Sequence, residues 1–184
     1  MAKVKWDKKL ENLVVSVSID QRINLEQFAK KAKDIEYDPD HFPGAIYRMK
    51  EPRVSALIFS SGKVNCTGAR HWDEIPLVVK QLEKKFKEGG LKPTKIESKV
   101  QNLVVSANLG YDVNIDVAAT ELDNVEYEPE QFPGLIFRVK EPKCVALVFT
   151  SGKINVVGAK LWENIDKAIA QVNKALKDVG AVME

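Results

Sequence analysis

Two kinds of side chain recur at fixed spacings along this sequence, and neither kind is a catalytic group. Phenylalanine pairs 17 residues apart and asparagine pairs 53 residues apart each occur twice. The pairs are Phe42 and Phe59, Phe132 and Phe149, Asn12 and Asn65, and Asn102 and Asn155. An amide both donates and accepts hydrogen bonds, and an exposed aromatic ring offers a flat apolar surface. Their repetition favours a binding surface over isolated core positions.

The groups that enzymes use are not arranged for chemistry. His41 and His71 have no cysteine, aspartate or histidine companions at ligand spacing, so no metal site is expected. The run Ser61-Gly62-Lys63 lacks the glycine-rich strand–loop–helix context of a phosphate loop. No nucleophile and base recur together, and the carboxylates are scattered over turns and helices. The sequence therefore predicts a protein that is not an enzyme and has no cofactor.

Composition and charge are those of a folded protein. The 184 residues are 45% hydrophobic and 29% charged, which argues against disorder. A net charge of +2 excludes a strongly cationic nucleic-acid coat. Residues 1–90 carry 17 basic and 13 acidic side chains, net +4, whereas residues 91–184 carry 11 and 13, net −2. The two halves are therefore suited to different partners.

Two cysteines do not make a disulfide framework. Cys66 and Cys144 lie in apolar, strand-like runs, where small core hydrophobes are expected, and a reducing compartment follows. The first residues form no signal-peptide core, and no stretch approaches 18 apolar residues, so no membrane partner is expected.

The most informative feature is self-similarity at an offset of 90. Residues 36–44 recur as 126–134, and 61–65 recur as 151–155. Between 34–72 and 124–162, 21 of 39 positions are identical without a gap. Two copies are too few for a solenoid. We expect two similar repeats, 1–91 and 92–184, related by a pseudo-two-fold axis.

Each repeat has the same order of expected elements. In the first, a strand spans 10–19 and a helix spans 24–33, with Asn24 as N-cap. Four strands follow near 35–38, 44–50, 53–60 and 63–69, separated by turn residues. A helix over 74–88, capped by Asp73, ends at Gly89-Gly90. A strand–helix–four-strand–helix unit, repeated twice, is typical of an α+β fold with an antiparallel sheet.

The helices cover one face of such a sheet, and the other face has an unusual composition. Alternation places Leu57 and Phe59 on this second face, with Asn65 and Thr67 on the neighbouring strand. An apolar sheet face with a few amides favours a binding surface, although packing against a partner domain or another subunit remains open. The DNA minor groove fits it, because A·T pairs offer only acceptors there and phenylalanines near strand ends can wedge between base steps.

Basic residues follow turns in both repeats, where they would hold phosphates at the rim of this face. They are Arg48, Arg53, Lys63 and Arg70, with counterparts Arg138, Lys143, Lys153 and Lys160. Two alternatives stay open: a duplicated α+β domain whose sheet cradles a small apolar molecule, and a protein-interaction platform that binds no DNA.

These motifs resemble the TATA-box-binding protein family over essentially the whole chain. The resemblance rests on the two copies at this spacing, on 101–104 (QNLV), on 127–136 (YEPEQFPGLI), and on 151–153 (SGK) followed by 158–160 (GAK). The absence of a long N-terminal extension resembles the archaeal, core-domain type. The resemblance implies a saddle-shaped, curved antiparallel sheet with its helices on the convex side.

The resemblance also implies roles for individual residues. Phe42 and Phe59, and Phe132 and Phe149, correspond to wedge pairs, and Asn12 and Asn102 to amides that bind base acceptors. Four residues correspond to apolar base or sugar contacts: Val14, Leu57, Val104 and Leu147. Thr67 matches a threonine near the pseudo-dyad, which Val157 replaces in the second repeat. Asn65 and Asn155 stand where many members have an aliphatic residue, and Glu128 and Glu130 match a contact with transcription factor B.

The resemblance implies a general transcription initiation factor. It would bind the minor groove of A·T-rich promoter DNA with the concave sheet, kink it by phenylalanine insertion, and recruit transcription factor B and RNA polymerase. The implied location is the archaeal cytoplasm at the nucleoid, or the nucleus in a eukaryote. A homodimer without DNA is a further possibility. Trp72 and Trp162, in a usually polar segment, are expected to pack as core or lid residues.

Overall fold

The computed structural model describes residues 6–183, which divide into two compact units. The first unit is Asn12–Gln101, and the second joins the residues up to Glu11 to those from Asn102 onward. Strands β1 (Lys8–Ile19) and β6 (Ile96–Asn108) cross these limits, so each gives one end to each unit. The compact units therefore differ from a division of the sequence at 91/92, because the repeats exchange their first strand residues.

In the first unit, β1 is followed by α1 (Leu25–Lys31), β2 (Ile35–Glu36), β3 (Ala45–Arg48), β4 (Ser55–Ile58), β5 (Lys63–Ala69) and α2 (Glu74–Glu88). The strand order is β2-β3-β4-β5-β1, and the neighbours are antiparallel. Each predicted element of this repeat is present, and the helix expected over 74–88 has those bounds.

The second unit repeats this order. After β6 come β7 (Asp112–Val113), α3 (Ile115–Glu121), β8 (Val125–Glu126), β9 (Leu135–Val139), β10 (Cys144–Val148), β11 (Lys153–Ala159), α4 (Trp162–Asp178) and β12 (Val182–Met183). The antiparallel order is β8-β9-β10-β11-β6. Strands β7 and β12 form a small separate sheet that the sequence pattern did not predict. The α+β class is confirmed.

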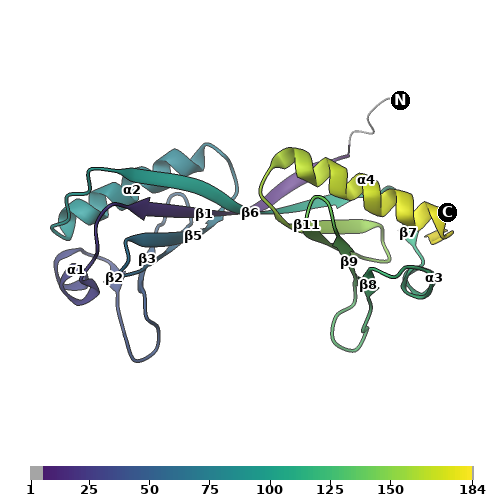
Figure 1. Cartoon of the computed structure of the whole chain (residues 1–184), viewed down its shortest axis with the longest axis horizontal. Helices are drawn as coiled ribbons and strands as arrows, with labels where there is room; N and C mark the ends of the chain where they lie inside the picture. Colours follow the sequence, from purple (N-terminus) through teal and green to yellow (C-terminus); the bar gives the residue numbers. More distant parts are fainter. Residues whose placement is uncertain (1–5, 184) are drawn as a thin grey trace. The chain divides into compact units, whose positions relative to one another are not determined.

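One face of each sheet is buried by its helices (Figure 1). In the first unit, Phe86 of α2 meets Phe28 of α1 with ring centroids 6.2 Å apart, and both rings are fully buried. In the second unit, α4 packs along β9, β10 and β11. Its apolar stripe is completely buried: Ile165, Ala168, Ile169, Val172 and Leu176. This burial supplies the main stabilising term and leaves one sheet face without helices.

Two local predictions about the helix starts have different outcomes. Asn24 is the N-cap of α1, since its side chain accepts a hydrogen bond from the Gln27 N–H. The Asp73 cap is wrong, because its side chain makes no capping bond. The N–H groups of Glu74 and Ile75 donate instead to the main-chain oxygens of His71 and Trp72, each at 3.2 Å, and Pro76 has no N–H for a cap to accept. The Glu74 carboxylate accepts from the N–H groups of Arg70 and His71, which precede the helix, at 2.7 and 3.1 Å.

The tryptophans also behave differently from one another. The side chain of Trp162 is half-buried, and the Lys8 ammonium lies 4.9 Å from its ring centroid. Trp72 is 44% exposed, so the expected core or lid packing is wrong for this residue. Cys66 and Cys144 are buried free thiols, as predicted. Within residues 6–183, no helix has the length and apolarity to cross a membrane.

Candidate functional site

The open face of each unit is the sheet face that carries no helix. In the first unit it presents Val14, Ser16, Leu57, Asn65 and Thr67, and in the second Val104, Ser106, Leu147, Asn155 and Val157. Leu57 lies opposite Asn65 across β4 and β5, and Leu147 lies opposite Asn155 across β10 and β11. The predicted contact residues therefore share one surface within each unit, as alternation requires.

The amide of Asn12 is held by a backbone group. Its Oδ1 accepts a hydrogen bond from the Gly68 N–H at 2.8 Å, and the Asn102 Oδ1 accepts from the Gly158 N–H at 2.6 Å. Because an N–H requires an acceptor, this bond fixes which amide atom faces the backbone. The NH₂ donors of both asparagines are left for partners on the open face.

The glycines that hold these amides lie where the register of the sheet shifts. The pairing slips between Leu13 and Val14 opposite Gly68, and again beside Gly158. Gly68 has φ +117° and Gly158 has φ +95°, conformations that side chains other than glycine rarely adopt. Each bulge thus turns an N–H toward the neighbouring strand, where the asparagine accepts it.

The two units differ beside these amides. In the first unit, the Asn12 Nδ2 donates to the Thr67 Oγ1 at 3.2 Å, so threonine takes up part of the donor capacity. In the second unit the corresponding residue is Val157, which offers no acceptor. The Asn102 amide therefore keeps more of its donor capacity for a ligand. The replacement of threonine by valine, which was noted in the sequence, removes one hydroxyl and so leaves more N–H donors of the Asn102 amide unbonded.

The four phenylalanines form two edge-to-face pairs. The ring centroids of Phe42 and Phe59 lie 6.0 Å apart, and those of Phe132 and Phe149 lie 5.8 Å apart. All four rings are half-buried. A Cβ on Gly134 would lie 2.7 Å from Phe132 and 3.1 Å from Phe149, so this glycine provides the space for the pair. Gly44 does the same in the first unit, at 2.8 and 3.2 Å.

The eight basic residues are exposed, but two of them are paired with carboxylates. The Nε of Arg48 lies 3.5 Å from the Glu36 Oε1, and the Nε of Arg138 donates to the Glu126 Oε1 at 2.9 Å. This bond lowers the pKa of Glu126 and raises the pKa of Arg138. Among residues 6–183 no carboxylate pairs with the other six, which are Arg53, Lys63, Arg70, Lys143, Lys153 and Lys160.

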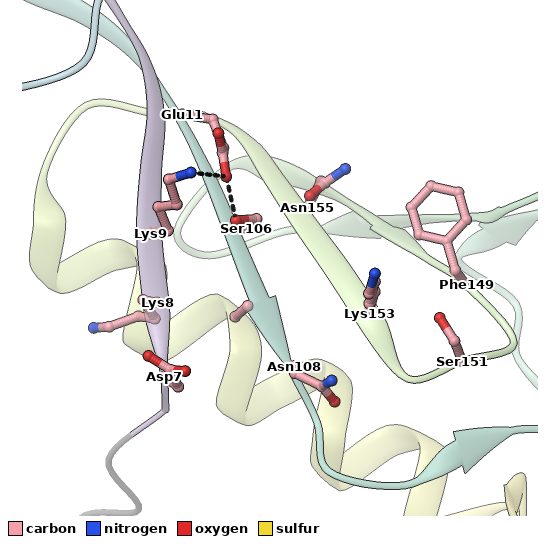
Figure 2. Close-up of a pocket in the computed structure, with 11 residues that line it drawn as sticks. Asp7, Lys8, Lys9, Glu11, Ser106, Asn108, Phe149, Ser151, Lys153 and Asn155 are labelled. Atoms are coloured by element: carbon pink, nitrogen blue, oxygen red, sulfur yellow. Dashed lines mark hydrogen bonds and ion pairs between the residues drawn. The ribbon is translucent and has the colours of Figure 1, made fainter.

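A hollow of about 590 Å³ occupies part of the second unit's open face. Figure 2 shows Phe149, Lys153 and Asn155 along one side of it, with Ser106 and Glu11 opposite. Its lining residues come mainly from β1, β6 and β11. Across the described part of the chain, no cluster of three or more histidine, cysteine or acidic side chains is placed to hold a metal ion.

The two glutamates of the loop before Phe132 are both exposed. The main-chain oxygen of Glu128 accepts from the N–H groups of Gln131 and Phe132, each at 2.9 Å. This turn fixes the backbone and leaves the carboxylates of Glu128 and Glu130 facing solvent. In the first unit the corresponding Asp38 is bonded to His41, with Nδ1 and Oδ2 2.8 Å apart.

Sequence reasoning missed several residues of the open face. They are Ser16 and Ser106, Ile46 and Ile136, the two bulge glycines, and Glu11 with its counterpart Gln101. The serines and isoleucines have the strand parity of the predicted contacts, so alternation was a sufficient signal for them. The glycines and the Glu11–Gln101 pair needed a knowledge of strand register, which the sequence pattern does not supply.

Comparison with known proteins gives consistent matches. The family described as "Transcription factor TFIID (or TATA-binding protein, TBP)" matches residues 7–88 and 97–179. The TATA-box-binding protein of Archaeoglobus fulgidus is 45% identical over 94% of this chain and 96% of its own length. That of Sulfurisphaera tokodaii is 44% identical, over 94% and 88%. The solved structure of Methanococcus jannaschii TBP superposes with a TM-score of 0.85 at 41% identity, covering 93% of this chain and 98% of that one.

Proposed function

Because this chain belongs to the TATA-binding protein family, a family of transcription factors rather than enzymes, we propose that it binds A·T-rich promoter DNA through the open faces of its units. The observation that carries the proposal is the pair of oriented amides. Gly68 and Gly158 hold the amide oxygens of Asn12 and Asn102, which leaves N–H donors within an apolar surface. The minor-groove edge of an A·T pair offers acceptors and no competing amino donor.

The phenylalanine pairs support insertion between base steps. This mode of binding is the one for which the family is known, and we carry it over from the resemblance. Phe42 and Phe132 each lie in a loop and rest against a second ring at the end of a strand. Flexible pyrimidine–purine steps such as TA are the easiest to unstack, so they supply much of the proposed selectivity.

The basic residues complete the proposed DNA contact. Lys63 and Lys153 begin strands β5 and β11 on the same faces as Asn65 and Asn155. The remaining cations lie at strand ends or in the turns between strands, where phosphates of a bound duplex would be within reach. These contacts position the DNA and carry no sequence information.

We further propose that Glu128 and Glu130 bind transcription factor B, which then brings RNA polymerase to the promoter. Both carboxylates are exposed beside a hydrogen-bonded turn in the repeat with net charge −2, which suits a basic protein partner. The double change Glu128→Gln and Glu130→Gln should leave DNA binding unchanged and weaken capture of factor B on the complex. Loss of both activities together would contradict this assignment. The protein would act at the nucleoid.

The first experiment measures binding and bending together. A duplex with a TATA-like element and a dye at each end is compared with a scrambled G·C-rich duplex. We expect tight binding and a shortened end-to-end distance on the first duplex alone. Equal affinity for both duplexes at low salt would contradict the proposal and favour a small apolar ligand or a protein as the occupant of the open face.

A further inference from the structure

The two units carry the same three-residue arrangement on their open faces, with one difference. In the second unit the residues are Lys9, Glu11 and Ser106, and in the first unit they are Lys99, Gln101 and Ser16. Each residue is offset by 90 positions from its counterpart, so the correspondence follows the internal repeat. The difference is a carboxylate in one unit where the other has a carboxamide.

This difference reverses a hydrogen bond. In the second unit the Ser106 Oγ donates to the Glu11 Oε1 at 2.7 Å, since a carboxylate only accepts. In the first unit the Gln101 Nε2 donates to the Ser16 Oγ at 2.8 Å, and that hydroxyl donates to the Lys99 main-chain oxygen at 3.3 Å. The second unit therefore presents an acceptor-rich, anionic group where the first presents a neutral amide with a remaining donor.

The charge of Glu11 is only weakly compensated by its nearest described cation. The Lys9 Nζ lies 3.9 Å from the Glu11 Oε1, and the lysine side chain is 73% exposed. An exposed ion pair at this distance contributes little stabilising free energy. The glutamate side chain is 36% exposed and faces the hollow that contains Asn155 (Figure 2). A ligand on this open face would therefore meet the carboxylate directly.

The Glu11 carboxylate interacts differently with A·T and G·C pairs in the minor groove. In the minor groove, adenine and thymine present only hydrogen-bond acceptors, so contact between a carboxylate and an uninterrupted run of A·T pairs is unfavourable. Guanine adds an amino group, which can donate a hydrogen bond to the carboxylate. Resting on the proposed function, we propose that Glu11 is a specificity-determining residue. It allows the second unit to accept a G·C pair that the first unit rejects, and it thereby fixes the orientation of the protein on its DNA element.

Orientation is the direct test. The duplex is a self-complementary A·T element in which one pair near one end is replaced by G·C, with a dye at that end. A second dye is placed on the protein through Glu121→Cys, an exposed position at the end of α3, because the native thiols are buried. Energy transfer then reports which unit lies nearer the G·C pair. For the unaltered chain we expect the second unit at that end.

Three variants make the test specific. Glu11→Gln should abolish the orientation preference. It should also tighten binding to the A·T-only element by roughly tenfold, which is the change in affinity that one unfavourable base pair typically causes. Gln101→Glu should weaken A·T-only binding and also abolish the preference. The double exchange, Glu11→Gln with Gln101→Glu, keeps the net charge and should reverse the orientation. Thermal unfolding of each variant confirms that the fold is retained.

The outcomes separate this inference from the proposed function. If all variants keep the orientation and affinity of the unaltered chain while still selecting A·T-rich DNA, the role of Glu11 is refuted and the proposed function stands. If the unaltered chain itself does not distinguish the A·T element from scrambled DNA, the proposed function fails first. Reversal by the charge-neutral exchange supports the inference and excludes a general effect of net charge.

Discussion

At the scale of single residues, Phe132 offers the clearest test of the proposed DNA contact. Its ring is half-buried against Phe149 and Gly134, and it is not part of the helix-covered core. Phe132→Ala should therefore preserve the fold and weaken binding to a TATA-like duplex by roughly tenfold, the size of one base–aromatic contact. Energy transfer between dyes at the two DNA ends should report reduced bending.

The internal repeat supplies the control for this change. Phe42→Ala removes the equivalent ring of the first unit, which forms the same edge-to-face contact with Phe59. Both variants should lose part of the bend, and the double variant should lose more than either. Unchanged bending and affinity in the Phe132 variant would remove the wedge assignment and leave its ring a packing role only.

A second residue-scale prediction concerns alkaline pH. Burial raises the pKa of the Cys66 thiol to about 12, whereas an unfolded thiol titrates near 8.5. Between these values the unfolded chain releases a proton that the folded chain retains, so the free energy of unfolding falls as the pH rises. The expected loss is about 2 kcal/mol between pH 7 and pH 10, measured by urea unfolding.

The repeat again indicates a matched variant. Val156 occupies in the second unit the position that Cys66 occupies in the first, and both side chains are fully buried. Cys66→Val should reduce the alkaline decline without disturbing the core. The part caused by Cys144, whose pKa burial also raises, should remain. An unaltered pH dependence would mean that other groups cause it.

At the scale of elements, the bulge in β11 connects backbone conformation to the proposed base contact. Gly158 has φ +95°, so Gly158→Ala should cost about 1–3 kcal/mol of stability and displace the N–H that holds Asn102. Affinity for A·T-rich DNA should fall with it. Gly180→Ala is the control, since φ is +68° there and nothing lies within 4 Å of an added Cβ. An equal loss of affinity in both variants would attribute the effect to general destabilisation.

The elements also show how far sequence reasoning extends. Hydrophobic periodicity was sufficient for α2 and α4, because each buries a long apolar stripe whose spacing is unambiguous. It was sufficient for the open face too, since strand alternation assigns Asn65, Leu57 and Thr67 to one side. It failed at Asp73, because the Ile75 N–H is already bonded to the main-chain oxygen of Trp72 and Pro76 has no N–H for a cap to accept.

What periodicity could not give is the pairing between distant segments. The exchange of strand ends brings Glu11 beside Ser106, and no local pattern predicts that neighbour. The bonds from Gly68 and Gly158 to the asparagines depend on register shifts that occur only once the strands are paired. The internal repeat identified residue types that recur at equivalent positions in both halves, but the contacts of these residues could be identified only from the folded structure.

At the scale of the whole molecule, the two repeats have become chemically unequal while keeping one architecture. The first repeat carries a net charge of +4 and the second of −2. Val157 in place of Thr67 leaves the second unit with a free amide donor on Asn102, and Glu11 in place of Gln101 gives it an acceptor where the first unit has a donor. A duplicated fold with unequal faces suits an asymmetric ligand.

The number of phosphate contacts can be measured from the salt dependence of the affinity for DNA. Eight cations would give a slope of log K against log salt of about −7, but the pairing of Arg48 and Arg138 with carboxylates leaves six and a slope of about −5. Glu126→Gln releases Arg138 and should steepen the slope by about one. Glu163→Gln makes the same charge change at the start of α4, on the helix-covered side, and should alter it less. A slope near zero would contradict the phosphate assignment, whereas equal steepening in both variants would indicate that net charge, and not Arg138, determines it.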